Sequence, residues 1–181
     1  MQLAAADPRL GALATVAGFL ADGSVFEATY GAEGITARRE QAAAAKAKYD
    51  RTGEPTQITV YSETEPDAAN YVPHPGAYDY YTNPERGGVA QYTNKLDVQS
   101  WPTWLALDAL AHAPTVTIPT LVVHSDGCAL PDNAKALHAA VAGPKELVWS
   151  DGNHWDYYDS PKQVDNAVAN VTRFFRTHLA A

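Results

Sequence analysis

The last third of the chain alternates between strand-like runs and a helical segment, and this alternation is the sequence feature that most constrains the fold. Residues 120–125 form an apolar, β-branched run, residues 131–142 form an Ala-rich helical pattern that Gly143 closes, and residues 146–150 form a second run. Short runs of this kind are typical of strands buried on both faces, as in a parallel sheet. The succession of strand, helix and strand therefore predicts an α/β fold.

An acid and a histidine follow the two predicted strands. Asp126 comes directly after the first strand, and His154 follows the second on a Gly-Asn turn. Catalytic groups of α/β proteins collect at the carboxyl ends of the strands. A carboxylate that orients an imidazole, and an imidazole that takes a proton from a nucleophile, are the acid–base half of a Ser-His-Asp triad. We therefore expect Asp126 to be the acid and His154 the base.

Other nearby residues offer alternative roles. Asp132 is a competing acid, although its place beside Pro131 also suits the first turn of a helix, where the helix dipole favours a carboxylate. Asp126 itself can serve as a turn residue ahead of Gly127. Cys128 lies on the loop of the acid and not on a strand-to-helix elbow, which disfavours it as a nucleophile.

The remaining histidine and acids of this region point to structural roles and not to a metal site. His124 lies inside a predicted strand, which favours a packed core histidine. The spacing of His124, Asp126 and His154 does not match that of a metal site. Asp156 and Asp159 are expected to support the loop that carries His154.

Three further segments extend the α/β pattern. Residues 2–6 resemble the last turn of a helix, and residues 10–18 a buried strand. Residues 160–163 read as a capping box with a proline at the first helical position of the last helix. The apolar residues expected on the inner face of this helix are Val164, Ala167, Val168, Val171 and Phe175. In the helix that starts at Pro131, the residues expected on the apolar face are Ala134, Leu137 and Val141.

Residues from about 20 to 115 do not follow this alternation of strand and helix. Residues 36–49 predict a helix with Thr36 as its cap and Gly53 after its end, a Pro- and Tyr-rich stretch covers residues 71–81, and residues 101–108 predict a short helix. The segment is too long for a plain loop, so we expect it to form an inserted helical lid. The acid–histidine module of residues 116–181 follows this lid. We expect the lid and the module to belong to a single domain of residues 1–181. The aromatic residues of the lid are candidates for substrate binding, with ordinary packing as the alternative: Tyr78, Tyr80, Tyr81, Trp101 and Trp104.

Composition excludes several classes of partner. The net charge is −8 and the pI about 5.1, which disfavours nucleic acid and anionic membrane surfaces. A single cysteine excludes an internal disulfide framework. The N-terminus does not resemble a secretory signal, and no apolar run reaches the roughly 18–20 residues of a membrane span. These features predict a cytoplasmic protein.

The chain resembles the α/β-hydrolase superfamily, and within it the dienelactone-hydrolase-like and acetyl-xylan-esterase-like branch. The similar segments are residues 7–18, residues 78–81 with 86–87, residues 131–134 with 143–149 and, for the catalytic-histidine loop, residues 152–159. The resemblance implies a partial α/β-hydrolase fold with about three parallel core strands, flanking helices and a lid. It also implies hydrolysis of an ester, lactone or related acyl bond by a serine, with Asp126 as the acid and His154 as the base, without a cofactor or metal.

The 181 residues contain no Gly-x-Ser-x-Gly motif, which carries the nucleophile in this superfamily. The resemblance therefore places the serine and the oxyanion hole before Met1, and the chain alone is expected to be inactive. A complementing upstream half would be needed to act on a small, ester-like substrate. The alternatives are one half of a split hydrolase and a non-catalytic remnant that binds a partner. The strand at residues 10–18 would expose an open sheet edge and favour self-association.

Overall fold

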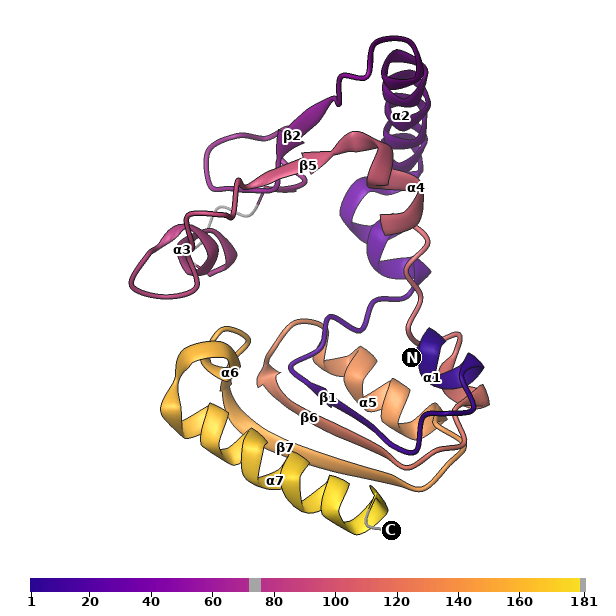
Figure 1. The fold of residues 1–181 in the computed structure, drawn as a ribbon, viewed down its shortest axis with the longest axis vertical. Coiled ribbons are helices and arrows are strands. Elements are labelled where there is room, and N and C mark those ends of the chain that lie inside the picture. Colours follow the sequence, from indigo (N-terminus) through magenta and orange to yellow (C-terminus); the bar gives the residue numbers. More distant parts are fainter. Residues whose placement is uncertain (72–75, 180–181) are drawn as a thin grey trace. The chain divides into compact units, whose positions relative to one another are not determined.

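The computed structural model describes residues 1–71 and 76–179 and divides the chain into two compact units (Figure 1). Unit 1 consists of Met1–Asp22 and Asp108–Ala181, and unit 2 consists of Gly23–Leu107. Part of the Pro- and Tyr-rich stretch, residues 72–75, lies outside the described residues.

Unit 1 contains a three-stranded parallel sheet, which confirms the predicted fold class and number of core strands. The strands are β1 (Leu13–Val16), β6 (Thr120–Gly127) and β7 (Lys145–Asn153). Their order is β1-β6-β7, so the central strand comes from the last third of the chain. Thr120 of β6 is in register with Leu13 on one side and Lys145 on the other.

The central strand β6 is buried on both faces from Thr120 to Ser125. Leu121 and Val123 belong to a core cluster that includes Phe174 of α7, whereas Val122 belongs to a second cluster that includes Leu137 of α5. The helices α5 and α7 therefore cover opposite faces of the sheet (Figure 1). This two-sided burial explains why β6 reads as a nearly continuous apolar run instead of an alternating one.

The helices of unit 1 largely match the predicted pattern. They are α1 (Gln2–Ala6), the 3-10 helix η2 (Ala113–Thr115), α5 (Pro131–Ala140), α6 (Asp156–Asp159) and α7 (Pro161–Leu179). The predicted inner face of α5 is confirmed, because Ala134, Leu137 and Val141 are all buried. The prolines at the start of α5 and α7 occupy positions where a backbone N–H is not needed.

The inner face of α7 is turned relative to the prediction. Ala167 and Phe174 are buried, and Val171 and Phe175 pack against the same cluster, but Val168 is 57% exposed. At 3.6 residues per turn, Phe174 lies about 20° around the helix from Ala167, whereas Val168 lies about 100° from it. The prediction for Val168 is therefore wrong, because the buried face of the helix passes through Ala167 and Phe174 and not through Val168.

Unit 2 combines helices with short strands. Its elements are α2 (Gly23–Thr52), β2 (Gln57–Thr59), β3 (Tyr61–Ser62), β4 (Asn70–Tyr71), α3 (Ala77–Thr82), β5 (Lys95–Asp97), the 3-10 helix η1 (Val98–Ser100) and α4 (Trp101–Trp104). The strands β2 and β5 pair antiparallel, and β3 and β4 pair parallel. These strands were not predicted from the sequence, because strands of two or three residues are too short to show a periodic pattern.

The helix expected at residues 36–49 lies within the longer α2, which has a non-helical Gly31 with φ of 65°. Thr36 is not a cap: its hydroxyl donates to the carbonyl of Ala32 at 3.0 Å, in the interior of the helix. The predicted end is confirmed, since Gly53 adopts φ of 72° and its N–H donates to the carbonyl of Tyr49 at 2.8 Å.

The difference between Phe174 and Val168 gives a direct test of the core of unit 1. We expect Phe174→Ala to lower the free energy of unfolding by about 3–5 kcal/mol, because it opens a cavity beneath the central strand. Val168→Ala on the same helix should change it by less than about 0.5 kcal/mol. Urea unfolding followed by circular dichroism measures both, and equal costs for the two variants would contradict this packing.

Candidate active site

The carboxyl ends of β6 and β7 bring Asp126 and His154 to the same edge of the sheet. Gly127 is in register with Asn153, and the backbone N–H of His154 donates to the carbonyl of Gly127 at 3.1 Å. The two strands approach so closely here that a Cβ on Gly127 would lie 2.5 Å from the carbonyl oxygen of Gly152. Only glycine fits at residue 127, and the close approach fixes the loops that carry the acid and the histidine.

Asp126 is held by a lysine and not by His154. Its side chain is 77% exposed, and Oδ1 lies 3.1 Å from Nζ of Lys135. Hydrogen bonds from Trp149 and then Lys135 lower the pKa of the Asp126 carboxyl below its ordinary value. Lys135 also lies 4.5 Å from the ring centroid of Trp149, so a cation–π contact helps to hold the ammonium group in place.

The competing acid, Asp132, contacts the same lysine. Its side chain is 95% exposed in the first turn of α5, and Oδ1 lies 3.8 Å from Nζ of Lys135. Among the described residues, neither Asp126 nor Asp132 forms a hydrogen bond with His154. Both acids therefore contact the same lysine, and this geometry does not distinguish Asp126 from Asp132 as the acid partner of His154.

Both ring nitrogens of His154 have partners. The backbone N–H of Ala129 donates to Nδ1 at 3.3 Å, and Nε2 lies 3.0 Å from the hydroxyl of Tyr158. The ring also makes edge contacts with Trp155 and Tyr158, at centroid distances of 4.8 and 5.2 Å. Burial, and then the charge of His124, lower the pKa of His154, which favours the neutral imidazole that a general base requires.

The expectation of a core role for His124 is confirmed. Its ring is 0% exposed, lies against Trp149 and donates from Nε2 to the carbonyl of Ala129 at 3.1 Å. Its Nδ1 atom is buried without a hydrogen-bond partner among the described residues, and burial lowers the pKa of the ring. Ala129 thus contacts His124 through its carbonyl and His154 through its N–H.

Cys128 has the environment of a structural residue. Its thiol is buried, and Sγ lies 3.2 Å from the hydroxyl oxygen of Ser125. Burial raises the pKa of the Cys128 thiol, which lowers the fraction of reactive thiolate. The Ser125 hydroxyl donates to the carbonyl of Gly152 at 2.6 Å, so Ser125 links the two strand ends.

Acidic residues stabilise the turn around His154. Asp156 accepts a hydrogen bond from the N–H of Asn153 at 2.7 Å, in agreement with its expected supporting role. The side chain of Asn153 in turn accepts the N–H of Trp155 at 2.9 Å. Asp151 forms an ion pair with Lys162 of α7 and does not serve the histidine.

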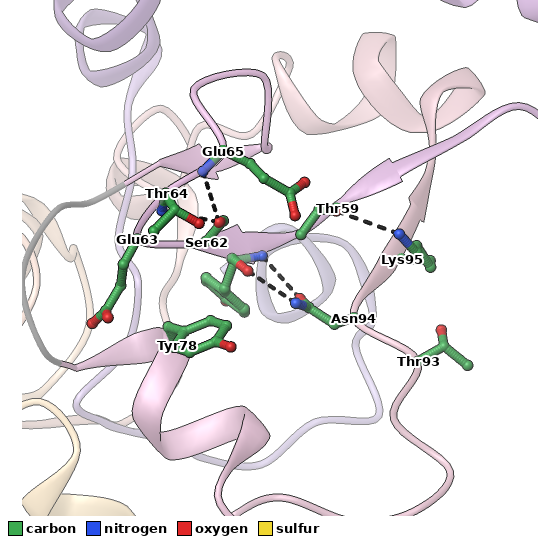
Figure 2. Close-up of a pocket in the computed structure, with 10 residues that line it drawn as sticks. Thr59, Ser62, Glu63, Thr64, Glu65, Tyr78, Thr93, Asn94 and Lys95 are labelled. Carbon is green, nitrogen blue, oxygen red and sulfur yellow. Dashed lines mark hydrogen bonds between the residues drawn. The ribbon is translucent and has the colours of Figure 1, made fainter.

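Three of the five aromatic residues predicted to bind substrate gather in one part of unit 2. Tyr81 stacks on Tyr61 at a centroid distance of 5.0 Å and meets Tyr80 edge to face at 5.1 Å. Tyr78 lines a cavity of about 380 Å³ (Figure 2). The other residues that line this cavity are Thr59, Tyr61, Ser62, Glu63, Thr64, Glu65, Thr93, Asn94 and Lys95.

The wall of this cavity is fixed by Asn94, which adopts φ of 52°. Its side chain accepts the N–H of Tyr61 and donates to the carbonyl of Tyr61, both at 2.9 Å (Figure 2). The backbone carbonyl of Asn94 also accepts the N–H of Val60 at 3.0 Å, so Asn94 extends the contact between the two segments beyond the pairing of β2 with β5. The residues that line the cavity are mostly polar.

The two tryptophans lie apart from the tyrosines and pack against α2. Trp101 is buried, and its indole N–H donates to the side chain of Gln41 at 3.0 Å. Trp104 meets Phe26 edge to face at 6.0 Å. In this structure Trp101 is a core residue of unit 2, which is the packing alternative considered for these aromatic residues.

Lys135 and Tyr158 are site residues that the sequence reasoning overlooked. Lys135 lies three residues after Asp132 on α5, and Tyr158 lies four residues after His154. The first spacing brings two side chains together on one face of α5, whereas the second spans the turn that leads from His154 into α6; these spacings were the available signal. In the described part of the chain, no cluster of three or more histidine, cysteine or acidic residues could hold a metal ion. Over the same residues, no helix is both long and apolar enough to cross a membrane.

Comparisons with known proteins identify the fold. No protein-family model matches the chain, and a comparison with curated proteins finds no match. Among solved structures, DcsB in complex with a substrate analogue matches 98% of this chain with a TM-score of 0.74 and 20% identity. The α/β-hydrolase GrgF from Penicillium sp. sh18 matches 99% with a TM-score of 0.75 and 21% identity. A monoacylglycerol lipase from Paleococcus ferrophilus matches 96% with a TM-score of 0.54 and 14% identity.

These matches show that the chain has part of an α/β-hydrolase fold. The chain spans 60% of the length of DcsB and of GrgF, and 62% of the lipase. A partial fold with three core strands agrees with this coverage.

The buried His124 and the half-buried His154 make the stability of unit 1 depend on pH. Burial lowers the pKa of both His124 and His154, so in mildly acidic solution the unfolded chain binds more protons than the folded one. The stabilisation is complete above the ordinary pKa of about 6.5 and is lost as the pH falls through the folded pKa. A difference of one pKa unit contributes about 1.4 kcal/mol.

We therefore expect the free energy of unfolding, measured with urea, to fall between about pH 7.5 and pH 5. His124→Gln should make this decrease smaller, since glutamine keeps a donor for Ala129 but does not titrate. A decrease of the same size in the variant and in the natural chain would contradict a neutral, buried His124.

Proposed function

We propose that this chain supplies the acid–histidine part of an α/β-hydrolase that cleaves an ester, lactone or related acyl bond. The observation that carries the proposal is the position of Asp126 and His154 at the carboxyl ends of two neighbouring parallel strands. Catalytic groups of α/β sheets collect at this edge. The fold match with α/β-hydrolases supports the same conclusion.

In the proposed reaction, His154 takes the proton from a serine hydroxyl and later returns it to the leaving group. Asp126 holds the imidazole and stabilises the imidazolium that forms. Because the pKa of His154 is lowered, the ring is neutral near pH 7 and can accept this proton. The serine would come from outside these 181 residues, which contain no Gly-x-Ser-x-Gly.

The proposed substrate class follows from the resemblance to the dienelactone-hydrolase-like and acetyl-xylan-esterase-like branch. The match with a monoacylglycerol lipase, whose name describes an ester-cleaving enzyme, supports an acyl substrate. We further propose that unit 2 is the lid of this hydrolase, and that Tyr78, Tyr80 and Tyr81 contribute to the substrate side of the lid. Trp101, by its burial, would support the lid from within.

Hydrolysis of p-nitrophenyl esters tests the proposal. We expect negligible turnover by the 181-residue chain alone, and turnover when it is joined or mixed with a polypeptide that carries Gly-x-Ser-x-Gly and is encoded directly upstream. In that assembly, His154→Ala and Asp126→Asn should each lower kcat by about 10⁴-fold, as removal of a triad member does.

Asp132→Asn is the matched control for the choice of acid, because Asp132 contacts the same lysine as Asp126. It should change kcat by less than about threefold, a difference below 1 kcal/mol. A large loss in Asp132→Asn with little change in Asp126→Asn would reassign the acid. Turnover by the chain alone that disappears in His154→Ala would contradict the need for a separate nucleophile.

A second candidate function, a module that associates through its sheet edge, is favoured by the hydrogen bonding of β1. Leu13 donates its N–H to the carbonyl of Pro119, directly before β6, at 2.8 Å, and Ala17 donates to the carbonyl of Val123 in β6 at 3.0 Å. In a parallel ladder, alternate residues bond to alternate sides, so the N–H groups of Ala14 and Val16 face the other edge of β1. Over the described residues β1 pairs with β6 alone, and an edge of this kind favours pairing with a second copy of the chain.

Ala14→Pro tests this edge. Proline removes the outward N–H of Ala14 without removing a hydrogen bond to β6, so we expect the natural chain to self-associate and the variant to shift to monomer. Ala14→Ser keeps the N–H and is the matched control. Light scattering after size-exclusion chromatography measures the mass, and self-association that persists unchanged in a folded Ala14→Pro chain would exclude pairing through β1.

A further inference from the structure

The imidazole of His154 is held by two hydrogen bonds that together define its protonation. A backbone N–H can only donate, so the bond from Ala129 to Nδ1 at 3.3 Å requires a lone pair on Nδ1. The proton of the neutral ring must then lie on Nε2, where it is donated to the hydroxyl oxygen of Tyr158 at 3.0 Å. Ala129 therefore selects the tautomer, and Tyr158 holds its single N–H.

A working triad needs the opposite tautomer. There, Nδ1–H donates to the carboxylate and Nε2 accepts a hydrogen bond from the nucleophile hydroxyl. In this structure Nδ1 is occupied by a donor, and the Asp126 carboxylate is paired with Lys135 at 3.1 Å. The hydroxyl of Tyr158 occupies the place against Nε2 that the nucleophile hydroxyl takes in a triad.

The surrounding rings make this arrangement well defined. Trp155 contacts both His154 and Tyr158 edge to face, at centroid distances of 4.8 and 5.5 Å, and the ring of Tyr158 lies 5.2 Å from that of His154. On the other side, the carbonyl of Ala129 accepts a hydrogen bond from the fully buried His124, which fixes the backbone that presents the Ala129 N–H.

We propose that Tyr158 is a positioning residue that, with the Ala129 N–H, holds His154 in a resting tautomer turned away from the acid. This inference rests on the proposed function for its catalytic meaning. To become a base, the neutral ring releases Nε2 from Tyr158 and Nδ1 from Ala129. It then loses its proton from Nε2 to water and gains one from water at Nδ1, with no net change of charge.

Nuclear magnetic resonance of the 15N-labelled chain tests the proposal without any assay of activity. Long-range proton–nitrogen correlations report the tautomer, and the signals of His154 are assigned by their loss in His154→Gln. We expect the Nε2–H tautomer, with Nδ1 shifted as a hydrogen-bond acceptor. A predominant Nδ1–H tautomer would overturn the proposal.

Tyr158→Phe then distinguishes the effect of the Tyr158 hydrogen bond from that of the Ala129 hydrogen bond. The variant should keep the Nε2–H tautomer, because Ala129 still donates to Nδ1. Exchange of the Nε2 proton with water should accelerate about tenfold, the effect of losing one hydrogen bond. Tyr49→Phe, an exposed tyrosine on α2, is the matched control and should leave exchange unchanged. Unchanged exchange in a folded Tyr158→Phe chain would refute the role of Tyr158.

The assembled hydrolase gives a second readout. If Tyr158 competes with the nucleophile for Nε2, Tyr158→Phe should raise kcat by up to about tenfold with little change in KM. A fall in kcat would show that Tyr158 assists the reaction and would overturn the resting-state role. If no assembly hydrolyses esters while the tautomer and the exchange behave as expected, the proposed function fails and the positioning of His154 by Tyr158 is upheld.

Discussion

The pairing of β6 with β7 is the interaction on which the rest of unit 1 depends. The register runs from Thr120 and Lys145 at one end to Gly127 and Asn153 at the other. Because β6 is buried on both faces, each helix of unit 1 that covers the sheet packs against a surface that this pairing defines. The same pairing sets the candidate site, since the close approach of Gly127 to Gly152 leads directly into the loop that carries His154.

The candidate site contains an acid, Asp126, and a histidine, His154, that are not hydrogen-bonded to each other. His154 is bound to Ala129 and Tyr158, and Asp126 is bound to Lys135. Location at the sheet edge is determined by the backbone, whereas the state of the imidazole is determined by the donors and acceptors around it. A position typical of catalysis and a tautomer ready for catalysis are therefore separate properties of this chain.

The sequence predicted the features that depend on long, buried patterns. The strand–helix–strand unit, the inner face of α5 and the buried role of His124 followed from apolar runs and their spacing. The short strands of unit 2 and the helix that extends well before Thr36 could not be predicted, because their residues carry no distinct periodicity. The face of α7 was misjudged because Phe174 and Phe175 are adjacent and both apolar, so the pattern alone allows two rotations of the helix. The partners of Asp126 and His154 depend on side chains and a backbone N–H from other segments, which no local pattern specifies.

Lys135 has a consequence for the energetics of any proton transfer at this edge. Its ammonium group is shared by Asp126 and Asp132 and lies against the ring of Trp149. A carboxylate that already binds one cation gains less from binding a second, so in the proposed hydrolase Lys135 and a protonated His154 would compete for Asp126. Formation of an imidazolium–carboxylate pair would then displace Lys135 from Asp126. Asp132, which lies 3.8 Å from the same ammonium group, would remain as its counter-ion.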